Sequence, residues 1–212
     1  LVTIINKAGL LLVILAFVVA VFVFSPVLYS EISYRKLEKE NLMNSNVVAM
    51  AGNADENEEV VTDSSIVAAD ASFSLVIPAI GANYKVVKDV DPMDSKIYQQ
   101  ALTKGVAHAL GTSYPGKAGN SFYFAHSSDT VFNANRYNAL FYLLKKLTKE
   151  DEFYLVYENT VYKYQVIETR EVPGDYIDLL SVNTTKKLAT LMTCWPPGTS
   201  LKRYVVIGEL VE

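Results

Sequence analysis

The sequence predicts a mainly β fold of the barrel or sandwich type, preceded by one N-terminal transmembrane helix. The β prediction rests on residues 73–212, where short runs of β-branched and aromatic residues alternate with turn-forming residues. The transmembrane prediction rests on residues 8–30, which contain no charged side chain. We therefore divide the chain into an N-terminal transmembrane anchor (1–32), a juxtamembrane segment with an acidic flexible tether (33–72) and a β domain (73–212).

The predicted anchor is long enough to cross a bilayer. At about 1.5 Å per residue, a helix over residues 8–30 spans roughly 30 Å, the thickness of the hydrocarbon core. A cleavable signal peptide is less favoured, because the nearest small-residue cleavage pattern, Ala49-Met50-Ala51, comes after a charged segment. Basic residues lie on both sides of the anchor, so the positive-inside rule leaves its orientation open.

The chain changes character twice after the anchor. Residues 31–41 have mixed charge and are predicted to form a short juxtamembrane helix. Residues 41–72 contain six acidic side chains, no lysine or arginine and no sustained period, which is typical of a flexible tether. A random coil of this length holds the β domain roughly 30 Å from the membrane on average. The alternative is an irregular arm that packs on the domain.

Charge and cysteine content exclude some classes of protein. The formal net charge is −4, and the 15 basic and 14 acidic residues beyond residue 72 leave the β domain nearly neutral, which argues against a nucleic-acid partner. Cys194 is the only cysteine, so the chain can form no internal disulfide. The fold must therefore be stabilised by a packed core, for which about 140 residues suffice.

Eight strands and two helices are predicted in the β domain. The strands are 74–77, 82–87, 106–110, 121–126, 152–157, 161–171, 187–194 and 202–211. One helix is predicted over 92–104, with Asp91 as its N-cap, Pro92 in its first turn and Gly105 beyond its end. A second helix is predicted over 138–147, where an apolar stripe faces the barrel. Tight turns are predicted at 157–161 and 173–175.

The stretch 190–203 carries the clearest chemistry. Cys194 ends a β-branched, apolar strand that two consecutive prolines bring to a stop. The next strand alternates, so Cys194 and Arg203 are predicted to face each other across the turn. A nearby guanidinium favours the reactive thiolate and can bind an oxyanion. The alternative is an inert buried cysteine, which the position at a strand end disfavours.

Only two histidines are available as a catalytic partner for the cysteine. His126 ends an apolar strand and opens into a polar loop, a usual place for a catalytic side chain. His108 lies inside a strand of small residues and is predicted to have a structural or supporting role. Two histidines and one cysteine without clustered spacing predict no metal site.

These segments together resemble the sortase family. Residues 190–194, Thr-Leu-Met-Thr-Cys, match the TLxTC signature of the family, and Arg203 falls where its arginine follows the cysteine. Residues 119–126 resemble the segment in which a Gly-Asn pair and a strand precede the family's histidine, although Ala125 stands where glycine is usual. The resemblance covers essentially all of residues 73–212.

The resemblance implies an eight-stranded sortase-type β-barrel in which three side chains meet in a groove. It implies that Cys194 is the nucleophile, His126 the general acid and base, and Arg203 the residue that stabilises the oxyanion or substrate. Thr193 and Trp195, which flank the cysteine, are expected to bind substrate. No cofactor or metal is expected.

The resemblance also implies a function. Sortases are membrane-anchored cysteine transpeptidases that cleave a C-terminal LPxTG-like sorting signal through a thioester and transfer the secreted client protein to an amine acceptor, a cell-wall peptide or a pilin. The expected location is the cell membrane, with a single-pass anchor and an extracellular catalytic domain. A cysteine hydrolase on the same barrel and a non-catalytic, membrane-tethered binding barrel are the two alternatives.

Overall fold

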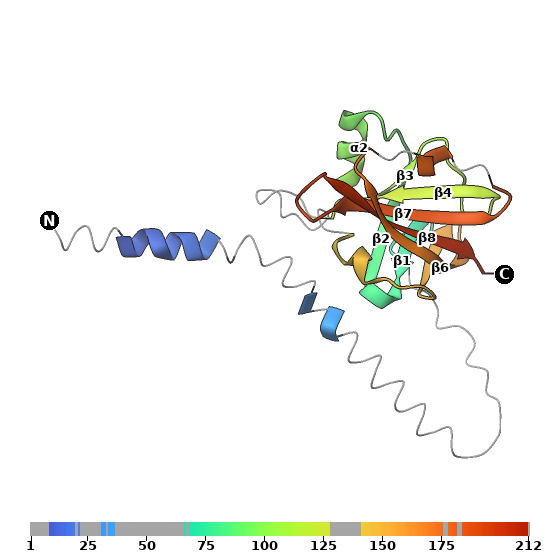
Figure 1. Ribbon diagram of the computed structural model, residues 1–212. Coiled ribbons are helices and arrows are strands. Elements are labelled where there is room, and N and C mark those ends of the chain that lie inside the picture. Colours follow the sequence, from blue (N-terminus) through green and yellow to red (C-terminus); the bar gives the residue numbers. More distant parts are fainter. Residues whose placement is uncertain are drawn as a thin grey trace, which may run out of the picture.

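The computed structural model describes residues 9–19, 21, 31–32, 34–36, 66, 68–127, 141–175, 178–181 and 184–211. Within these residues, eight strands form a closed barrel in the order β1-β2-β3-β4-β7-β8-β6-β5 (Figure 1). The predicted mainly β fold is confirmed, and the barrel is the form it takes. The strands are β1 (Phe73–Ile77), β2 (Ala82–Val90), β3 (Val106–Ala109), β4 (Gly119–Phe124), β5 (Glu152–Tyr157), β6 (Thr160–Pro173), β7 (Lys187–Trp195) and β8 (Lys202–Leu210).

Alternation along the strands gives the barrel a closed apolar interior. Tyr123 of β4, Leu191 of β7 and Val206 of β8 lie side by side in register and are fully buried. Burial of each such side chain stabilises the fold by about 1.5–3 kcal/mol. Because successive side chains point to opposite faces, the residues on either side of Tyr123 and Leu191 lie on the outer face of the sheet. That outer face of β4 and β7 carries the site described below.

The helix α2 (Ser95–Leu102) is shorter than the predicted span of 92–104 and has a different N-cap. The side chain of Asp94 accepts hydrogen bonds from the backbone N–H groups of Lys96 and Ile97, whereas Asp91 accepts from Met93 in a separate turn. The Asp91 prediction is therefore wrong, because that carboxylate closes a turn around Pro92 and leaves the cap to the next acidic residue.

The second predicted helix, 138–147, is also corrected. Its described part is a turn followed by the 3₁₀-helix η2 (Tyr142–Lys146), and residues 138–140 lie outside the described residues. Phe141, Leu144 and Leu147 are buried, so the predicted apolar stripe does face the barrel. Two further 3₁₀-helices, η1 (Pro78–Ile80) and η3 (Asp178–Ser181), were not expected.

Both predicted turns are present. Between β5 and β6, Glu158 and Asn159 have positive φ angles of 48° and 63°, as a two-residue hairpin of type I′ requires. Residues 174–175 form the turn after β6.

The N-terminal predictions are described only in part. Residues 9–19 and 21 are helical, and their large apolar side chains are exposed. No helix within the described residues is long and apolar enough to cross a membrane. The other residues of the predicted anchor lie outside the described part of the chain. Of the predicted juxtamembrane helix, residues 31–32 and 34–36 are described and helical.

The end of the predicted tether is packed on the barrel. Asp70 forms an ion pair of 2.6 Å with Lys85 of β2, which holds the pKa of Asp70 well below its usual range. The carbonyls of Ala71 and Ser72 accept hydrogen bonds from the backbone of residues 159 and 158 in the β5–β6 turn. Residues 69–72 are therefore part of the barrel and not of a flexible tether. Residues 41–65 and 67 lie outside the described residues.

Removal of residues 1–72 is expected to destabilise the barrel relative to removal of residues 1–65. The shorter chain loses the carbonyls of Ala71 and Ser72 as acceptors, and two backbone hydrogen bonds together contribute about 1–3 kcal/mol. The melting temperature should fall by about 5 °C. Thermal unfolding of both truncated chains, followed by circular dichroism, measures the difference, and equal melting temperatures would contradict the packing role of residues 69–72.

Candidate active site

Three neighbouring strands bring three distant residues to one end of the barrel. β7 pairs with β4 in parallel and with β8 in antiparallel register. Phe124 lies opposite Met192, so His126 and Cys194, each two residues further along, reach the same end. Cys194 lies directly opposite Arg203, as the sequence analysis predicts. His126 and Cys194 are 68 residues apart in the sequence, and the parallel pairing alone makes them neighbours.

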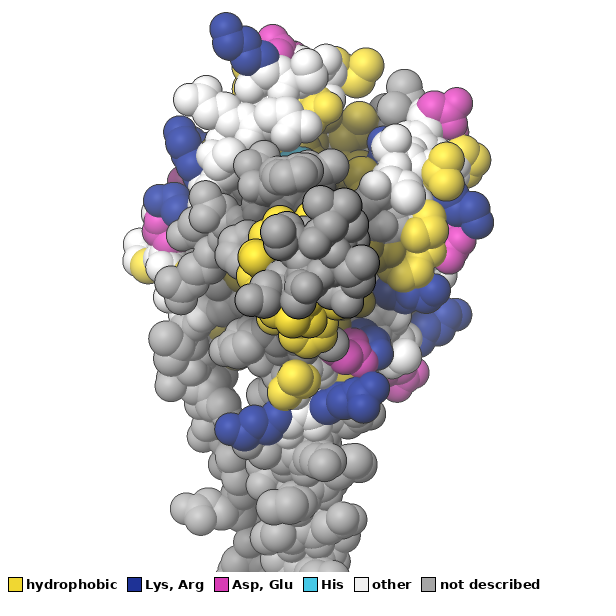
Figure 2. Space-filling view, turned by 90° about the vertical axis from the view of Figure 1, so that its left-hand side faces the viewer, with side chains coloured by type: hydrophobic (Ala, Val, Ile, Leu, Met, Phe, Trp, Pro, Cys, Tyr) yellow, Lys and Arg dark blue, Asp and Glu magenta, His cyan; other side chains and the backbone are white. Residues whose placement is uncertain are grey.

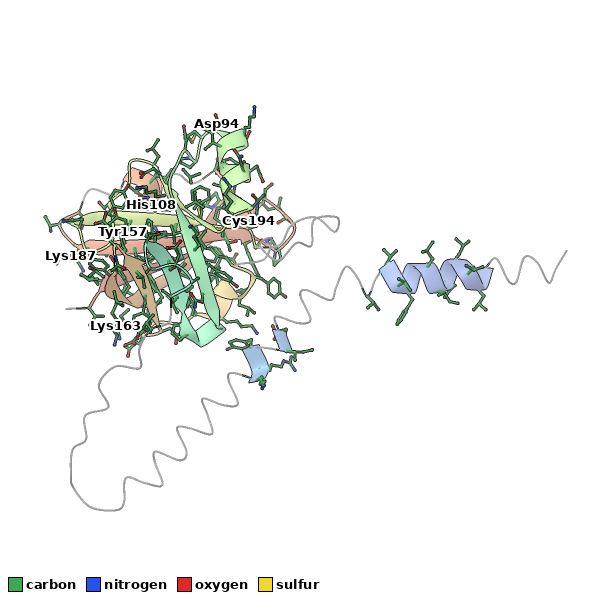
Figure 3. All side chains as sticks on the ribbon, turned by 180° about the vertical axis from the view of Figure 1, so that it is seen from behind. Asp94, His108, Tyr157, Lys163, Lys187 and Cys194 are labelled. Carbon is green, nitrogen blue, oxygen red and sulfur yellow. The ribbon has the colours of Figure 1, made fainter. Side chains whose placement is uncertain are left out.

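These three residues line a single groove on the outer face of the barrel. The groove encloses a cavity of about 390 Å³, and its lining includes His126, Cys194 and Arg203. In Figure 3, Cys194 lies at the end of its strand, and the labelled cap Asp94 marks α2 above it. All three side chains are partly exposed. The thiol is therefore within reach of a molecule that enters the groove.

The rest of the groove is largely apolar. Its wall includes Tyr98 and Leu102 of α2, Phe122 and Phe124 of β4, Leu180 of η3 and Met192 of β7. Figure 2 looks onto this end of the molecule and shows recessed hydrophobic side chains between projecting parts of the surface, with lysine, arginine and acidic side chains interspersed around it. Such a groove favours an apolar or extended ligand over a highly charged one.

The sequence analysis missed this apolar wall. Tyr98 and Leu102 are four residues apart on α2, a spacing that places both on one helix face. That spacing predicts only that the face packs against something. Leu180 could not be assigned to the groove wall from the sequence, because no pattern predicted the 3₁₀-helix η3 that contains it.

Arg203 is held by the turn that it follows. One terminal nitrogen, Nη1, donates hydrogen bonds of 3.1 Å to the carbonyl oxygens of both Ser200 and Lys202. The guanidinium thus lies at the mouth of the groove, with its remaining donors available in fixed directions. It can satisfy an oxyanion there without the large rearrangement that a freely rotating lysine would need.

The two threonines of the 190–194 stretch connect β7 to β4. The hydroxyl of Thr190 donates to the side-chain oxygen of Asn120 at 2.8 Å, and the hydroxyl of Thr193 donates to the carbonyl of Ala125 at 2.8 Å. Both threonines are buried. Thr193 lines the groove, but its hydroxyl is engaged with the residue before His126. Its contact with the β4 end therefore positions the histidine strand against the cysteine strand.

Trp195 is not among the residues that line the groove, and its role in substrate binding stays a prediction. It follows Cys194 on the strand and points to the opposite face, where its ring lies 6.2 Å from that of Tyr204. The ammonium of Lys145 lies 4.2 Å above the indole ring. On that face, Glu171 accepts a hydrogen bond from Lys202 at 2.8 Å, and this bond lowers the pKa of Glu171.

His108 lies in a separate, aromatic environment. It is fully buried, and its Nε2–H donates to the carbonyl of Ser113 at 3.0 Å. The ring stacks on Tyr114 at a centroid distance of 4.9 Å. Figure 3 shows His108 within the barrel, away from Cys194. The residue is placed as part of the core, which is the role that the sequence analysis favours.

Within the described part of the chain, no group of three or more His, Cys, Asp or Glu side chains is placed to hold a metal ion.

Comparison with known families identifies the barrel and its groove together. The family model of the sortase domain matches residues 75–211. The chain belongs to the sortase family. Sortases are cysteine transpeptidases, and the TLxTC segment and Arg203 lie inside the matched range. The match therefore includes all three residues of the candidate active site.

Individual sortases are similar to this chain at moderate identity. Sortase D of Bacillus subtilis is 29% identical over 144 residues, which cover 66% of this chain and 64% of the relative. Sortase A of Listeria monocytogenes is 26% identical over 137 residues, which cover 65% of this chain and 55% of the relative. The chain thus spans less than two thirds of the length of either curated relative.

Solved sortase structures have the same fold. Sortase C-1 from Actinomyces oris superposes with a TM-score of 0.57 at 29% identity, covering 68% of this chain and 76% of the other. Sortase A from Corynebacterium diphtheriae superposes with a TM-score of 0.56 at 25% identity, covering 66% of this chain and 60% of the other. The similarity spans sortases of different named types.

The buried His108 should make this sortase less stable in mild acid. Burial lowers its pKa, so the folded protein binds fewer protons than the unfolded chain, whose histidine titrates near 6.5. The stability associated with this group is therefore full above that pH and is lost as the pH falls below it. His108→Gln keeps a donor for Ser113 and should reduce the loss.

Urea unfolding at about pH 7.5 and about pH 5.5 measures this effect. His126→Gln serves as the matched control, because that histidine is partly exposed at the groove. An equal acid-induced shift in the wild type and in both variants would contradict the assignment to His108.

Proposed function

We propose that this sortase is a membrane-anchored cysteine transpeptidase that cleaves a C-terminal LPxTG-like sorting signal and transfers the client protein to an amine on the cell surface. One observation carries the proposal. The register of β4, β7 and β8 places a thiol, an imidazole and a guanidinium in one groove that the family match includes. The known chemistry of sortases uses a cysteine nucleophile.

The reaction follows from the groups present. The Cys194 thiolate attacks the scissile carbonyl carbon, and a C–S bond forms while the carbonyl oxygen takes up negative charge. The remaining N–H groups of Arg203 bind that oxygen. The C–N bond then breaks, and imidazolium His126 gives its proton to the departing amine, which leaves a thioester.

In the second half of the reaction, His126 accepts a proton, whereas in the first half it donates one. An acceptor amine attacks the thioester carbonyl, and neutral His126 takes the proton that the amine loses. Collapse of the second tetrahedral intermediate breaks the C–S bond and regenerates the Cys194 thiolate. An apolar groove favours this outcome over hydrolysis, because it limits water around the thioester.

The proposed clients are secreted proteins with a sorting signal, and the proposed acceptors are amines of a cell-wall peptide or a pilin. Membrane attachment is proposed through residues 8–30. Apolar side chains in the described helical part, from Leu10 to Val21, are about half to two-thirds exposed, as a lipid-facing helix requires. The catalytic barrel is proposed to lie on the extracellular side, where clients and cell-wall amines are found.

Transpeptidation is tested with the full chain in detergent, a library of sorting-signal peptides and hydroxylamine as amine acceptor, read by mass spectrometry. The expected product is a hydroxamate at the cleaved carbonyl. Cys194→Ala should lose turnover by about 10³-fold or more, and His126→Ala by about 10²- to 10⁴-fold. His108→Gln, corrected for any loss of folded protein, is the control and should retain turnover.

Other outcomes separate the alternatives. A carboxylic acid product that persists with excess hydroxylamine would identify a cysteine hydrolase. Failure of a peptide aldehyde or thiol-reactive probe to label Cys194 in the folded protein would favour a non-catalytic binding barrel.

Arg203→Ala should lower turnover by about 10²- to 10³-fold, the usual effect of removing one oxyanion donor, or roughly 2.7–4 kcal/mol. Arg203→Lys should recover little, since an ammonium lacks the fixed donor fork. Lys202→Ala is the control: its partly exposed bond to Glu171 is worth under about 1 kcal/mol. Because Arg203 also binds two carbonyls of the turn, turnover is compared with melting temperature. Near-normal turnover, or a loss that unfolding explains, would rule out the oxyanion role.

A further inference from the structure

The 3₁₀-helix η2 contacts the segment that directly follows the uncharged stretch of the predicted anchor, residues 8–30. The Nζ atom of Lys146 lies 3.2 Å from the carboxylate of Glu31 and 4.9 Å from the ring centroid of Tyr34. Tyr34 is partly buried and packs against the hydrophobic core of the barrel. Figures 1 and 3 both show residues 31–36 (blue) beside the barrel and next to η2. We call residues 31–36 the docking arm.

The same short helix contacts the catalytic end of the barrel. The backbone N–H of Phe141, at the start of this segment, donates to the carbonyl of His126 at 3.2 Å. Lys145 lies over the ring of Trp195, the residue after Cys194, and 4.0 Å from Glu171. Two adjacent lysines of η2 thus face in different directions, Lys145 to the cysteine strand and Lys146 to the docking arm.

We propose that the docking arm holds the catalytic end of the barrel against the membrane surface. This inference rests on the proposed membrane anchor, whose uncharged stretch ends at residue 30, directly before Glu31. Because Glu31 is bound to Lys146, the distance between membrane and barrel is set by the docked arm. The roughly 30 Å separation expected from a free tether then does not apply.

The ion pair between Glu31 and Lys146 is of a strength that suits a contact within one chain. A partly exposed ion pair is weak between separate molecules. A covalent link of about thirty residues gives the arm an effective concentration on the order of millimolar, so a modest contact suffices. Arg35 lies 3.6 Å from Glu31 one helical turn away and helps to orient the carboxylate toward η2.

Zero-length cross-linking tests the docking itself. The full chain in lipid nanodiscs is treated with a carbodiimide, which joins a carboxylate to an amine that it already touches. We expect an isopeptide bond between Glu31 and Lys146, found by mass spectrometry and lost in Lys146→Arg. The barrel pair Lys186 and Glu209, at 2.7 Å, is the internal control. Formation of the control bond without the Glu31–Lys146 bond would overturn the docking.

Energy transfer from Trp195, the only tryptophan, tests the position of the catalytic end. Nanodiscs carry a lipid with a dansyl-labelled headgroup as acceptor. Lys146→Glu should reduce the transfer at least about twofold, and the charge exchange Glu31→Lys with Lys146→Glu should restore most of it. Lys149→Glu, an exposed lysine three residues along, is the matched control and should leave the transfer unchanged.

The outcomes distinguish this inference from the proposed function. A chain that does not remain with the nanodisc would overturn the anchor and this inference with it, while the peptide assay in detergent would still report transpeptidation. A nanodisc-bound chain with equal energy transfer in the wild type and in Lys146→Glu would overturn the placement by the docking arm alone.

Discussion

The pairing of β7 with β4 on one side and with β8 on the other is the constraint on which the active site depends. Side chains in a sheet alternate between faces, so a slip of one residue in either pairing would move Cys194 to the face opposite its partners. The hydroxyls of Thr190 and Thr193 oppose such a slip, because each bonds to β4 or to its end from a buried position. The threonines of the TLxTC segment thus have a physical role of their own. They hold the strand that carries the thiol in register with the strand that carries the histidine.

The two faces of the β7–β8 turn have different roles: one presents groups to the groove, and the other holds the turn together. On the groove face, the guanidinium of Arg203 uses one nitrogen to bind two carbonyls of the turn and keeps other donors for a ligand. On the other face, Glu171 accepts a hydrogen bond from Lys202, and the ammonium of Lys145 lies over the ring of Trp195. Glu171 is therefore paired with Lys202 on the far side of the strand, and Arg203 bonds to backbone carbonyls of the turn. This separation explains why a residue next to the nucleophile, Trp195, is outside the groove although its sequence position suggests substrate contact.

Local patterns predicted the strands well and their assembly poorly. Alternation and turn residues located all eight strands, and Cys194 opposite Arg203 followed from a short hairpin. The parallel pair β4–β7 joins segments far apart in the chain, and alternation within one strand carries no information about its neighbour. The meeting of His126 with Cys194 therefore came from family resemblance and not from the pattern. The N-cap at Asp91 and the α-helix over residues 138–147 were predicted wrongly for a different reason. Which residue caps a helix, and whether a short helix is α or 3₁₀, depends on the backbone groups that tertiary packing leaves unpaired.

The two histidines show how the barrel assigns different chemistry to one residue type. His108 lies in the closed interior among Phe73, Tyr114 and Tyr123, where desolvation disfavours the imidazolium and an adjacent carbonyl selects one tautomer. His126 lies two residues beyond the last residue of β4, partly exposed, in the groove that Cys194 also lines. At the end of a strand, a side chain is held by the sheet and is also open to solvent. All three residues proposed for catalysis lie at such positions, at the same end of three adjacent strands.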